Sequence, residues 1–206
     1  MKNIEHIIFD LGNVILNIDY QKTIEEFNKL GISNASSLYS QSSQSSIFDL
    51  LETGKISDQK FISEIKKLCP KKTSKEIIKA WNAILLEIPN ERILLLNKLK
   101  TNFNIFLLSN TNSIHIKELI YKLGVKKYNE FYSIFKKVYY SHEIGLRKPN
   151  PEIFKLIIKE NNLKIQNILF IDDSTQHIES AKKIGVFTHH LLKHETIETI
   201  FPDIVQ

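Results

Sequence analysis

Three short apolar runs, each ending in polar residues, constrain the fold of this chain most strongly. They read HIIFD (6–10), NIFLLSN (104–110) and NILFIDD (167–173). Such runs are typical of strands that are buried on both faces of a parallel sheet, and amphipathic helical patterns separate them. Two further stretches, VYYSH (138–142) and VFTHHLL (186–192), are also expected to be strands. The pattern predicts an α/β fold, a three-layer Rossmann-like parallel sheet covered by helices.

Helical patterns connect most of these strands. Residues 113–123 carry apolar side chains on one face, and residues 151–162 do the same after Pro151, a good first helical residue. These stretches are therefore predicted to be helices that pack on the sheet.

Residues 20–88 contain no strand signal, so they interrupt the alternation. We expect a helix ending at Leu30, a second over 57–68, and a third that carries Ile77, Ile78, Trp81, Ile84, Leu85 and Ile88. The serine-rich stretch 36–46 is expected to be a loop or a frayed helix. The chain is thus predicted to hold an α/β core, residues 1–16 and 90–206, and a small helical cap, residues 17–89, inserted after the first strand.

Composition limits the classes of partner. The 206 residues are 42% hydrophobic, enough for one globular domain with an insert, and no apolar run reaches the roughly 18 residues of a membrane helix. The net charge is +5, but the lysines are scattered and no nucleic-acid-binding motif accompanies them. The single cysteine, Cys69, cannot form an internal disulfide. We expect a cytoplasmic protein without a nucleic-acid or membrane partner; monomer and homodimer both remain open.

Carboxylates follow two of the predicted strands. Asp10 ends the first run, and Asp172 and Asp173 end the last of the three runs, while Ser109 and Asn110 end the second. Ligands bind at the carboxyl ends of strands in open parallel sheets, so these residues are expected to share one crevice. Carboxylates grouped in this way suit Mg²⁺. The alternatives are that Asp10 is a turn residue and that Asp173 caps a helix starting near Ser174.

A lysine is predicted to join this group. Lys148 stands in GLRKPNPEIF (145–154), a loop between a strand and the helix marked by Pro151. A lysine fixed beside carboxylates neutralises them and a bound phosphoryl group. The hydroxyl of Ser109 and the amides near Asn110 can hold phosphoryl oxygens. The alternative is that Lys148 is a solvated surface lysine.

Four stretches in this order resemble the motifs of the haloacid dehalogenase superfamily. They are FDLGNVIL, LLSNTN, GLRKPNPEIF and FIDDSTQHIESAKKIG. Within it the chain resembles the small bacterial sugar phosphatases related to alpha-D-glucose-1-phosphate phosphatase. The resemblance implies an Mg²⁺-dependent phosphatase whose partner is a small phosphorylated metabolite, with sugar phosphates such as glucose 1-phosphate expected.

The resemblance also implies a role for each motif residue. Asp10 would be the nucleophile that forms an aspartyl-phosphate. Mg²⁺ would be held by Asp10, the main-chain carbonyl of Gly12, Asp172 and Asp173. Ser109 and Asn110 would bind the substrate's phosphoryl group, and Lys148 would bridge nucleophile and phosphate, so Asp10, Ser109 and Lys148 are the expected catalytic residues.

The chain departs from the superfamily at Gly12. Most phosphatases of the superfamily have an aspartate there, which protonates the leaving oxygen and later activates water. Asp19 could supply the proton, or could instead cap a helix beginning at Tyr20. Sugar 1-phosphates, which have a better leaving group than alkyl phosphates, would depend less on that proton.

Three side chains near the motifs are harder to assign. His177 could tune a metal-bound water but is expected to lie on a helix surface, and His115 could contact substrate or pack over the loop. Trp81 is expected in the hydrophobic core. The alternative activities are a 2-haloacid dehalogenase, a catalytically weak domain that binds phosphorylated ligands, and a phosphomutase.

Overall fold

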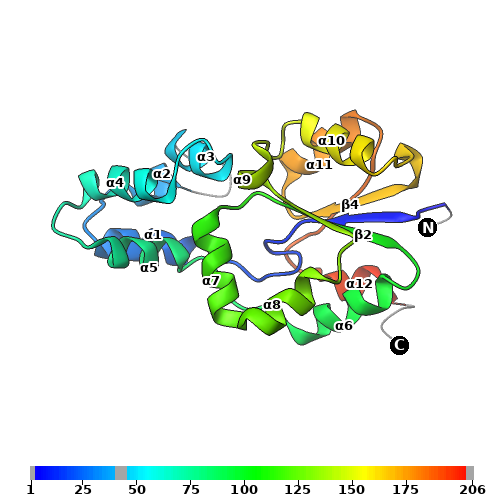
Figure 1. The fold of residues 1–206 in the computed structure, drawn as a ribbon, viewed down its shortest axis with the longest axis horizontal. Coiled ribbons are helices and arrows are strands. Elements are labelled where there is room, and N and C mark those ends of the chain that lie inside the picture. Colours follow the sequence, from blue (N-terminus) through cyan, green and yellow to red (C-terminus); the bar gives the residue numbers. More distant parts are fainter. Residues whose placement is uncertain (1–2, 40–45, 203–206) are drawn as a thin grey trace.

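The computed structural model describes residues 3–39 and 46–202, and its centre is a parallel sheet of five strands in the order β3-β2-β1-β4-β5 (Figure 1). The strands are β1 (His6–Phe9), β2 (Asn104–Ser109), β3 (Lys137–Tyr140), β4 (Ile168–Asp172) and β5 (Phe187–His190). All five coincide with the stretches predicted from sequence. One end differs, because Ser141 and His142 begin helix α9 (Ser141–Ile144) and do not continue β3.

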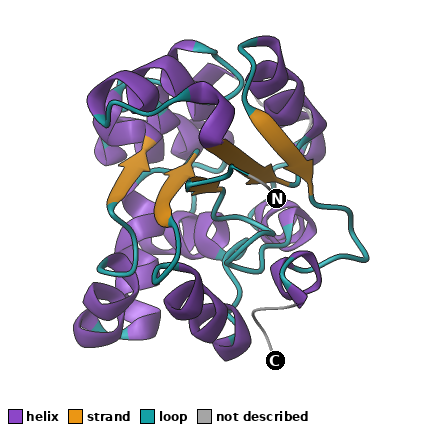
Figure 2. Cartoon of the chain, turned by 90° about the vertical axis from the view of Figure 1, so that its right-hand side faces the viewer, coloured by secondary structure: helices purple, strands orange, loops and turns teal. Residues whose placement is uncertain are grey.

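Helices cover both faces of the sheet, so the three-layer α/β prediction is confirmed (Figures 1 and 2). Ile7 and Phe9 of β1 face one core, while Ile8 between them faces the other. The first core includes α6 (Asn90–Leu99), α7 (Ser113–Leu123), α8 (Val125–Tyr132) and α12 (Ile197–Ile200). The second includes α10 (Glu152–Glu160) and α11 (Thr175–Lys183), and a short 3₁₀ turn, Ile165–Asn167, precedes β4.

In the part of the chain that the structure describes, five helices lie between β1 and α6, and Figure 1 shows them grouped to one side of the sheet. They are α1 (Tyr20–Lys29), α2 (Ala35–Leu38), α3 (Ser46–Glu52), α4 (Asp58–Leu68) and α5 (Ser74–Asn82). We call them the helical insert. The serine-rich stretch is helical at its start, in α2, and residues 40–45 lie outside the described part of the chain. The division into a core and a cap at residues 17 and 89 stays a prediction.

The third predicted helix of the insert is shorter than expected. It ends at Asn82, and Ile84, Leu85 and Ile88 lie beyond it. The chain there pairs with the segment that enters the insert: Asp19 N–H donates to the Ile84 carbonyl at 2.9 Å, and Leu86 N–H to the Asn17 carbonyl at 3.0 Å. Pro89 also disfavours helical geometry at the residue before it. These hydrogen bonds hold the two connecting segments side by side.

Trp81 is the centre of the insert's core, as predicted. Its ring contacts those of Phe27, Tyr39, Phe48 and Phe61, and all five side chains are buried. Its other neighbours belong to the sheet region: His115 stacks on it, and its indole N–H donates to Asn112 Oδ1 at 3.4 Å. The insert is therefore fixed to the start of α7 by its largest side chain.

Among the described helices, none is long and apolar enough to cross a membrane.

Gly54, in the turn after α3, lies against the backbone of His142 in the sheet region. A Cβ at Gly54 would overlap the carbonyl oxygen of His142, and the residue has a φ of +64°. We expect Gly54→Ala to lower the free energy of unfolding by roughly 2–4 kcal/mol, because strain and overlap add. Gly31 has a φ of +94° with nothing near its Cβ position, so Gly31→Ala should cost only roughly 1–2 kcal/mol. Urea denaturation measures the free energy of unfolding of both variants. An equal loss in the two would show that the contact between Gly54 and His142 adds nothing to the cost of the substitution.

Candidate active site

A buried lysine joins the ends of three neighbouring strands. The Lys148 side chain is fully buried, and its Nζ lies 2.5 Å from Asp10 Oδ1, 2.6 Å from Asp172 Oδ2 and 3.0 Å from the Leu108 carbonyl oxygen. The sheet register explains the meeting, because Phe9 pairs with both Leu107 and Ile171. Leu108 of β2 and Asp172 of β4, which follow these partners, therefore lie level with Asp10. All three ammonium protons have acceptors.

Asn110 holds the main chain of this lysine. Its side-chain N–H₂ donates to the Lys148 carbonyl at 2.8 Å, and its Oδ1 accepts from the Lys148 N–H at 2.9 Å. This pair of bonds fixes the loop that carries Lys148 against the end of β2. Asn110 also lines the cavity described below. Because its amide group is bonded to the Lys148 main chain, only the remaining hydrogen-bonding capacity of that amide is available to a ligand.

Three carboxylates form a compact group of oxygen ligands beside the lysine. Asp10, Asp172 and Asp173 each offer an oxygen, and these atoms lie within 4.8 Å of one another. Asp173 accepts from Asn13 Nδ2 at 3.0 Å, and it is Asp172 whose Oδ1 accepts the N–H of Ser174 at the start of α11. The donors are all hard oxygens, which suits Mg²⁺.

Burial and the shared lysine separate the acidities of these carboxylates. Burial raises the pKa of Asp10 to about 7 despite the opposing effect of Lys148, and the nearby Asp172 and Asp173 also raise it. Burial alone would also raise the pKa of Asp172, yet Lys148 and His177 together lower it to about 2. Burial raises the pKa of Asp173 as well. A cation placed among the three would favour their charged forms.

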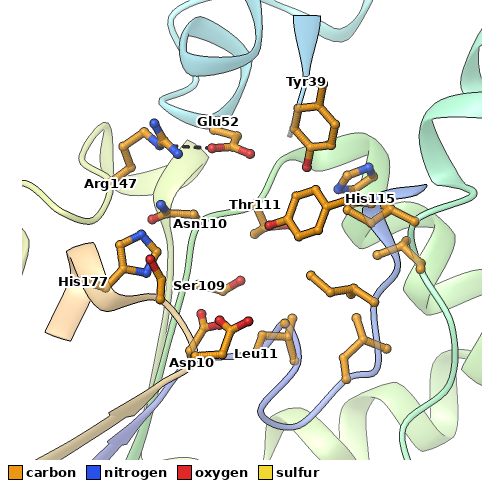
Figure 3. A pocket seen from close by; sticks show the side chains of 18 residues that line it. Asp10, Leu11, Tyr39, Glu52, Ser109, Asn110, Thr111, His115, Arg147 and His177 are labelled. Atoms are coloured by element: carbon orange, nitrogen blue, oxygen red, sulfur yellow. Dashed lines mark ion pairs between the residues drawn. The ribbon is translucent and has the colours of Figure 1, made fainter. Parts of the chain in front are cut away.

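A cavity opens above these groups (Figure 3). Asp10, Gly12, Ser109 and Asp173 line it from the sheet, and the helical insert contributes other lining residues. The remaining lining side chains divide by polarity. Those that are polar or charged are Tyr20, Tyr39, Glu52, Asn110, Thr111, His115, Arg147, Ser174 and His177; those that are apolar are Leu11, Leu16, Ile18, Ile84 and Leu85.

His177 lies at the site, so the expectation that it sits on a helix surface is wrong. Its Nδ1 is 3.0 Å from both oxygens of Asp172, and its side chain is 17% exposed. The first turn of α11 returns toward the end of β4 and brings His177 back over Asp172. Sequence reasoning could have used this five-residue separation across a strand-to-helix turn.

The other uncertain residues are also placed. Asp19 caps α1, accepting from Gln21 N–H at 2.9 Å, and is not among the cavity-lining residues. His115 lines the cavity and also packs: its Nε2 is 3.2 Å from the Trp81 carbonyl oxygen and its Nδ1 3.1 Å from Asn112 Nδ2. Burial lowers the pKa of His115 to about 4, so it is neutral at physiological pH.

Gly12 has no side chain, and the Ile18 side chain occupies the space beside it. A Cβ at this position would lie 2.8 Å from Ile18 Cδ1 and 3.9 Å from Asp10 Oδ2. A side chain at position 12 would therefore fit beside Asp10 only if the end of the Ile18 side chain moved.

Two contacts in the cavity were not anticipated from sequence. Arg147, next to the buried lysine, pairs with Glu52 of α3, with Nε 3.0 Å from Oε2. Tyr20 and Tyr39 join Glu52 in lining the cavity from the insert. Arg147 belongs to the GLRKPNPEIF stretch, but Tyr20, Tyr39 and Glu52 lie far from it in the sequence and belong to none of the four motifs.

Comparisons with known proteins agree with this geometry. Residues 7–190 match the family model of haloacid dehalogenase-like hydrolases. The chain is 32% identical over 189 residues to a D-ribitol-5-phosphate phosphatase of Bacteroides thetaiotaomicron, covering 90% of each chain. A solved haloacid dehalogenase family enzyme from the same organism, in complex with magnesium and inorganic phosphate, matches with a TM-score of 0.82 and 32% identity over 96% of this chain and 99% of that one.

A second solved structure, a predicted hydrolase of this type from Porphyromonas gingivalis, has a TM-score of 0.84 and 26% identity over 99% of this chain and 98% of that one. The family match spans all four of the sequence motifs that meet around Lys148. The chain belongs to the haloacid dehalogenase-like hydrolases.

Proposed function

We propose that the protein is an Mg²⁺-dependent phosphatase that hydrolyses phosphomonoesters of small metabolites through an aspartyl-phosphate. The observation that carries the proposal is the buried Lys148, which is held between Asp172 and Asp10, a residue that lines the cavity. The relative named as a ribitol 5-phosphate phosphatase supports a phosphorylated polyol or sugar as substrate.

Asp10 is the nucleophile in this proposal. One carboxylate oxygen attacks phosphorus and the ester oxygen departs, which leaves an acyl phosphate on Asp10. Lys148 already contacts Asp10 and would neutralise charge on the attacking and phosphoryl oxygens. Ser109, which lines the cavity beside Asp10, would bind a phosphoryl oxygen. Asn110 then contributes chiefly by fixing Lys148.

The carboxylates of Asp10, Asp172 and Asp173, with the main-chain carbonyl of Gly12, would hold the metal. Mg²⁺, when bound, would supply positive charge to the phosphoryl oxygens. A dehalogenase that displaces halide without a metal would not need the Asp173 carboxylate as a metal ligand. The carboxylate group thus favours phosphoryl transfer over dehalogenation.

The leaving oxygen receives no proton from position 12. Asp19 does not line the cavity, and burial raises the pKa of the Tyr20 hydroxyl, which makes it a weak acid. We propose that the proton comes from water. Among sugar phosphates, the 1-phosphates such as glucose 1-phosphate would suffer less from the missing acid than the alkyl phosphates, because their leaving oxygen is less basic.

Phosphate release from sugar 1-phosphates, sugar 6-phosphates, ribitol 5-phosphate and para-nitrophenyl phosphate tests the proposed activity. We expect turnover that requires Mg²⁺ and is abolished in Asp10→Asn, because the amide oxygen is a poor nucleophile. Asp19→Asn is the matched control: asparagine also caps helices, so activity should persist. Turnover by Asp10→Asn equal to that of the wild type would contradict the proposal.

Restoring a carboxyl at position 12 tests the role of the missing acid. We expect Gly12→Asp to raise kcat on primary alkyl phosphates, by up to about 10²-fold, and to change kcat on sugar 1-phosphates much less. Gly12→Ala imposes the same displacement on Ile18 without the acid and is the control. The same gain on both substrate classes would show that leaving-group basicity does not matter here.

A further inference from the structure

The hydroxyl group of Tyr39 projects into the cavity from the helical insert, on the side remote from Asp10 (Figure 3). We infer that this hydroxyl, together with that of Thr111, binds a hydroxyl group on the part of the substrate that lies away from the phosphoryl group. The substrate is then a phosphomonoester with a hydroxyl-bearing remainder, such as a polyol phosphate, and not an alkyl phosphate. This inference rests on the proposed phosphatase activity and specifies its substrate class.

The Tyr39 hydroxyl is available to a ligand. Tyr39 follows α2, is 4% exposed and lines the cavity. Within residues 3–39 and 46–202, which the structure describes, no group forms a hydrogen bond with this hydroxyl. The phosphoryl group lies at Asp10 in the proposed reaction. The remainder of a substrate that extends through the cavity therefore approaches Tyr39.

Three aromatic rings fix the direction of this hydroxyl. The Tyr39 ring packs against those of Tyr20, Phe48 and Trp81, with centroids 5.5, 4.9 and 4.6 Å away. Phe48 and Trp81 are themselves fully buried. A group that packing already holds in place loses little conformational freedom when a ligand binds to it. The Tyr39 hydroxyl is therefore preorganised to make a hydrogen bond in the cavity.

Thr111, two residues after β2, supplies the second hydroxyl. Ser141 holds its main chain: the Thr111 N–H donates to Ser141 Oγ at 2.9 Å, and the Ser141 hydroxyl donates to the Thr111 carbonyl at 3.0 Å. The Thr111 side chain lines the cavity, and none of the described residues forms a hydrogen bond with its hydroxyl. Two unbonded hydroxyl groups, one from the insert and one from the sheet region, thus line the same cavity.

Hydroxyl-bearing and alkyl substrates would meet these two groups differently. A substrate hydroxyl both donates and accepts, so it can pair with the hydroxyls of Tyr39 and Thr111. An alkyl chain would displace water from them without replacing its hydrogen bonds, which is costly for buried polar groups. Burial raises the pKa of Tyr39 well above its usual value, so the hydroxyl keeps the proton that it donates. The cavity should therefore favour a hydroxylated remainder.

Other buried tyrosine hydroxyls in this protein have partners within the fold. Those of Tyr128 and Tyr140 lie 3.1 Å apart and hydrogen-bond to each other, away from the cavity. Removing either hydroxyl breaks a bond inside the protein, whereas removing that of Tyr39 breaks none among the described residues. A polar group kept without a partner at a cavity serves binding and adds nothing to stability. Tyr128 is therefore the matched control for Tyr39.

The test compares phosphomonoesters that differ in their hydroxyl groups. The pairs are ribitol 5-phosphate against pentyl phosphate, and glycerol 3-phosphate against propyl phosphate, with kcat/KM measured for each in the presence of Mg²⁺. We expect the wild type to prefer the hydroxylated member of at least one pair by about tenfold or more. Tyr39→Phe removes only the hydroxyl and should reduce this ratio about fivefold or more. Comparing the ratio between enzymes cancels the difference in leaving group within a pair.

Two further variants separate substrate binding from structure. Tyr128→Phe removes a buried tyrosine hydroxyl outside the cavity and should leave the ratio unchanged. It should also lower the free energy of unfolding in urea, whereas Tyr39→Phe should not. Thr111→Val keeps the shape of the side chain but removes the second hydroxyl, so it should lower the ratio too. This variant tests the inference even if Tyr39→Phe fails to fold.

An unchanged ratio in Tyr39→Phe overturns the inference, whether activity is kept on both members of the pair or lost equally on both. The same fall in Tyr128→Phe overturns it as well, as does a wild type that prefers neither hydroxylated substrate. Para-nitrophenyl phosphate serves as the reference substrate. Failure to hydrolyse any phosphomonoester with Mg²⁺ overturns the proposed function itself, whereas hydrolysis of the reference without discrimination overturns only the role of the two hydroxyls.

Discussion

The site depends on the burial of one positive charge. The Lys148 ammonium is out of contact with water, and an unpaired charge there would cost several kcal/mol, on the order of 3–5 if a partner were removed. Asp10, Asp172 and the Leu108 carbonyl each accept one of its protons. The sheet register sets these acceptors at one level, and Asn110 holds the lysine's main chain among them. Fold and site are therefore specified together.

Charge varies along the cavity in a way that suits a phosphomonoester. Asp10 and Asp173 line one end of the cavity, and Asp10 is paired with the buried Lys148. The lysine and the carboxylates that we propose hold Mg²⁺ could together balance a phosphoryl dianion at this end. The opposite end carries an oriented carboxylate, Glu52, with tyrosine hydroxyls near it. The end of the Ile18 side chain occupies the space beside Gly12, the position at which most phosphatases of the superfamily have an aspartate. In the proposed reaction, one end of the cavity would bind the phosphoryl group, and the other would bind the remainder of the substrate.

The sequence predicted what local patterns encode. The strands were identifiable from their apolar runs, and the meeting of Asp10 and Asp172 followed from parallel strand ends. The end of α5 was not identifiable, because the apolar spacing continues to Ile88 while hydrogen bonds to the entering segment stop the helix. The pairing of Arg147 with Glu52 joins residues 95 positions apart, and no local pattern reports such a contact.

Direct detection of a phosphoryl group on Asp10 tests the account most sharply. Most phosphatases of the superfamily have an aspartate at position 12, which also activates the water that hydrolyses the aspartyl-phosphate. With Gly12 in its place, the aspartyl-phosphate should break down slowly and accumulate during turnover. Acid quenching of the enzyme during turnover with Mg²⁺, followed by peptide mass spectrometry, should find the phosphoryl group on the peptide that contains Asp10, and none in Asp10→Asn. Continued turnover with no phosphorylated peptide at any time point would contradict covalent catalysis by Asp10.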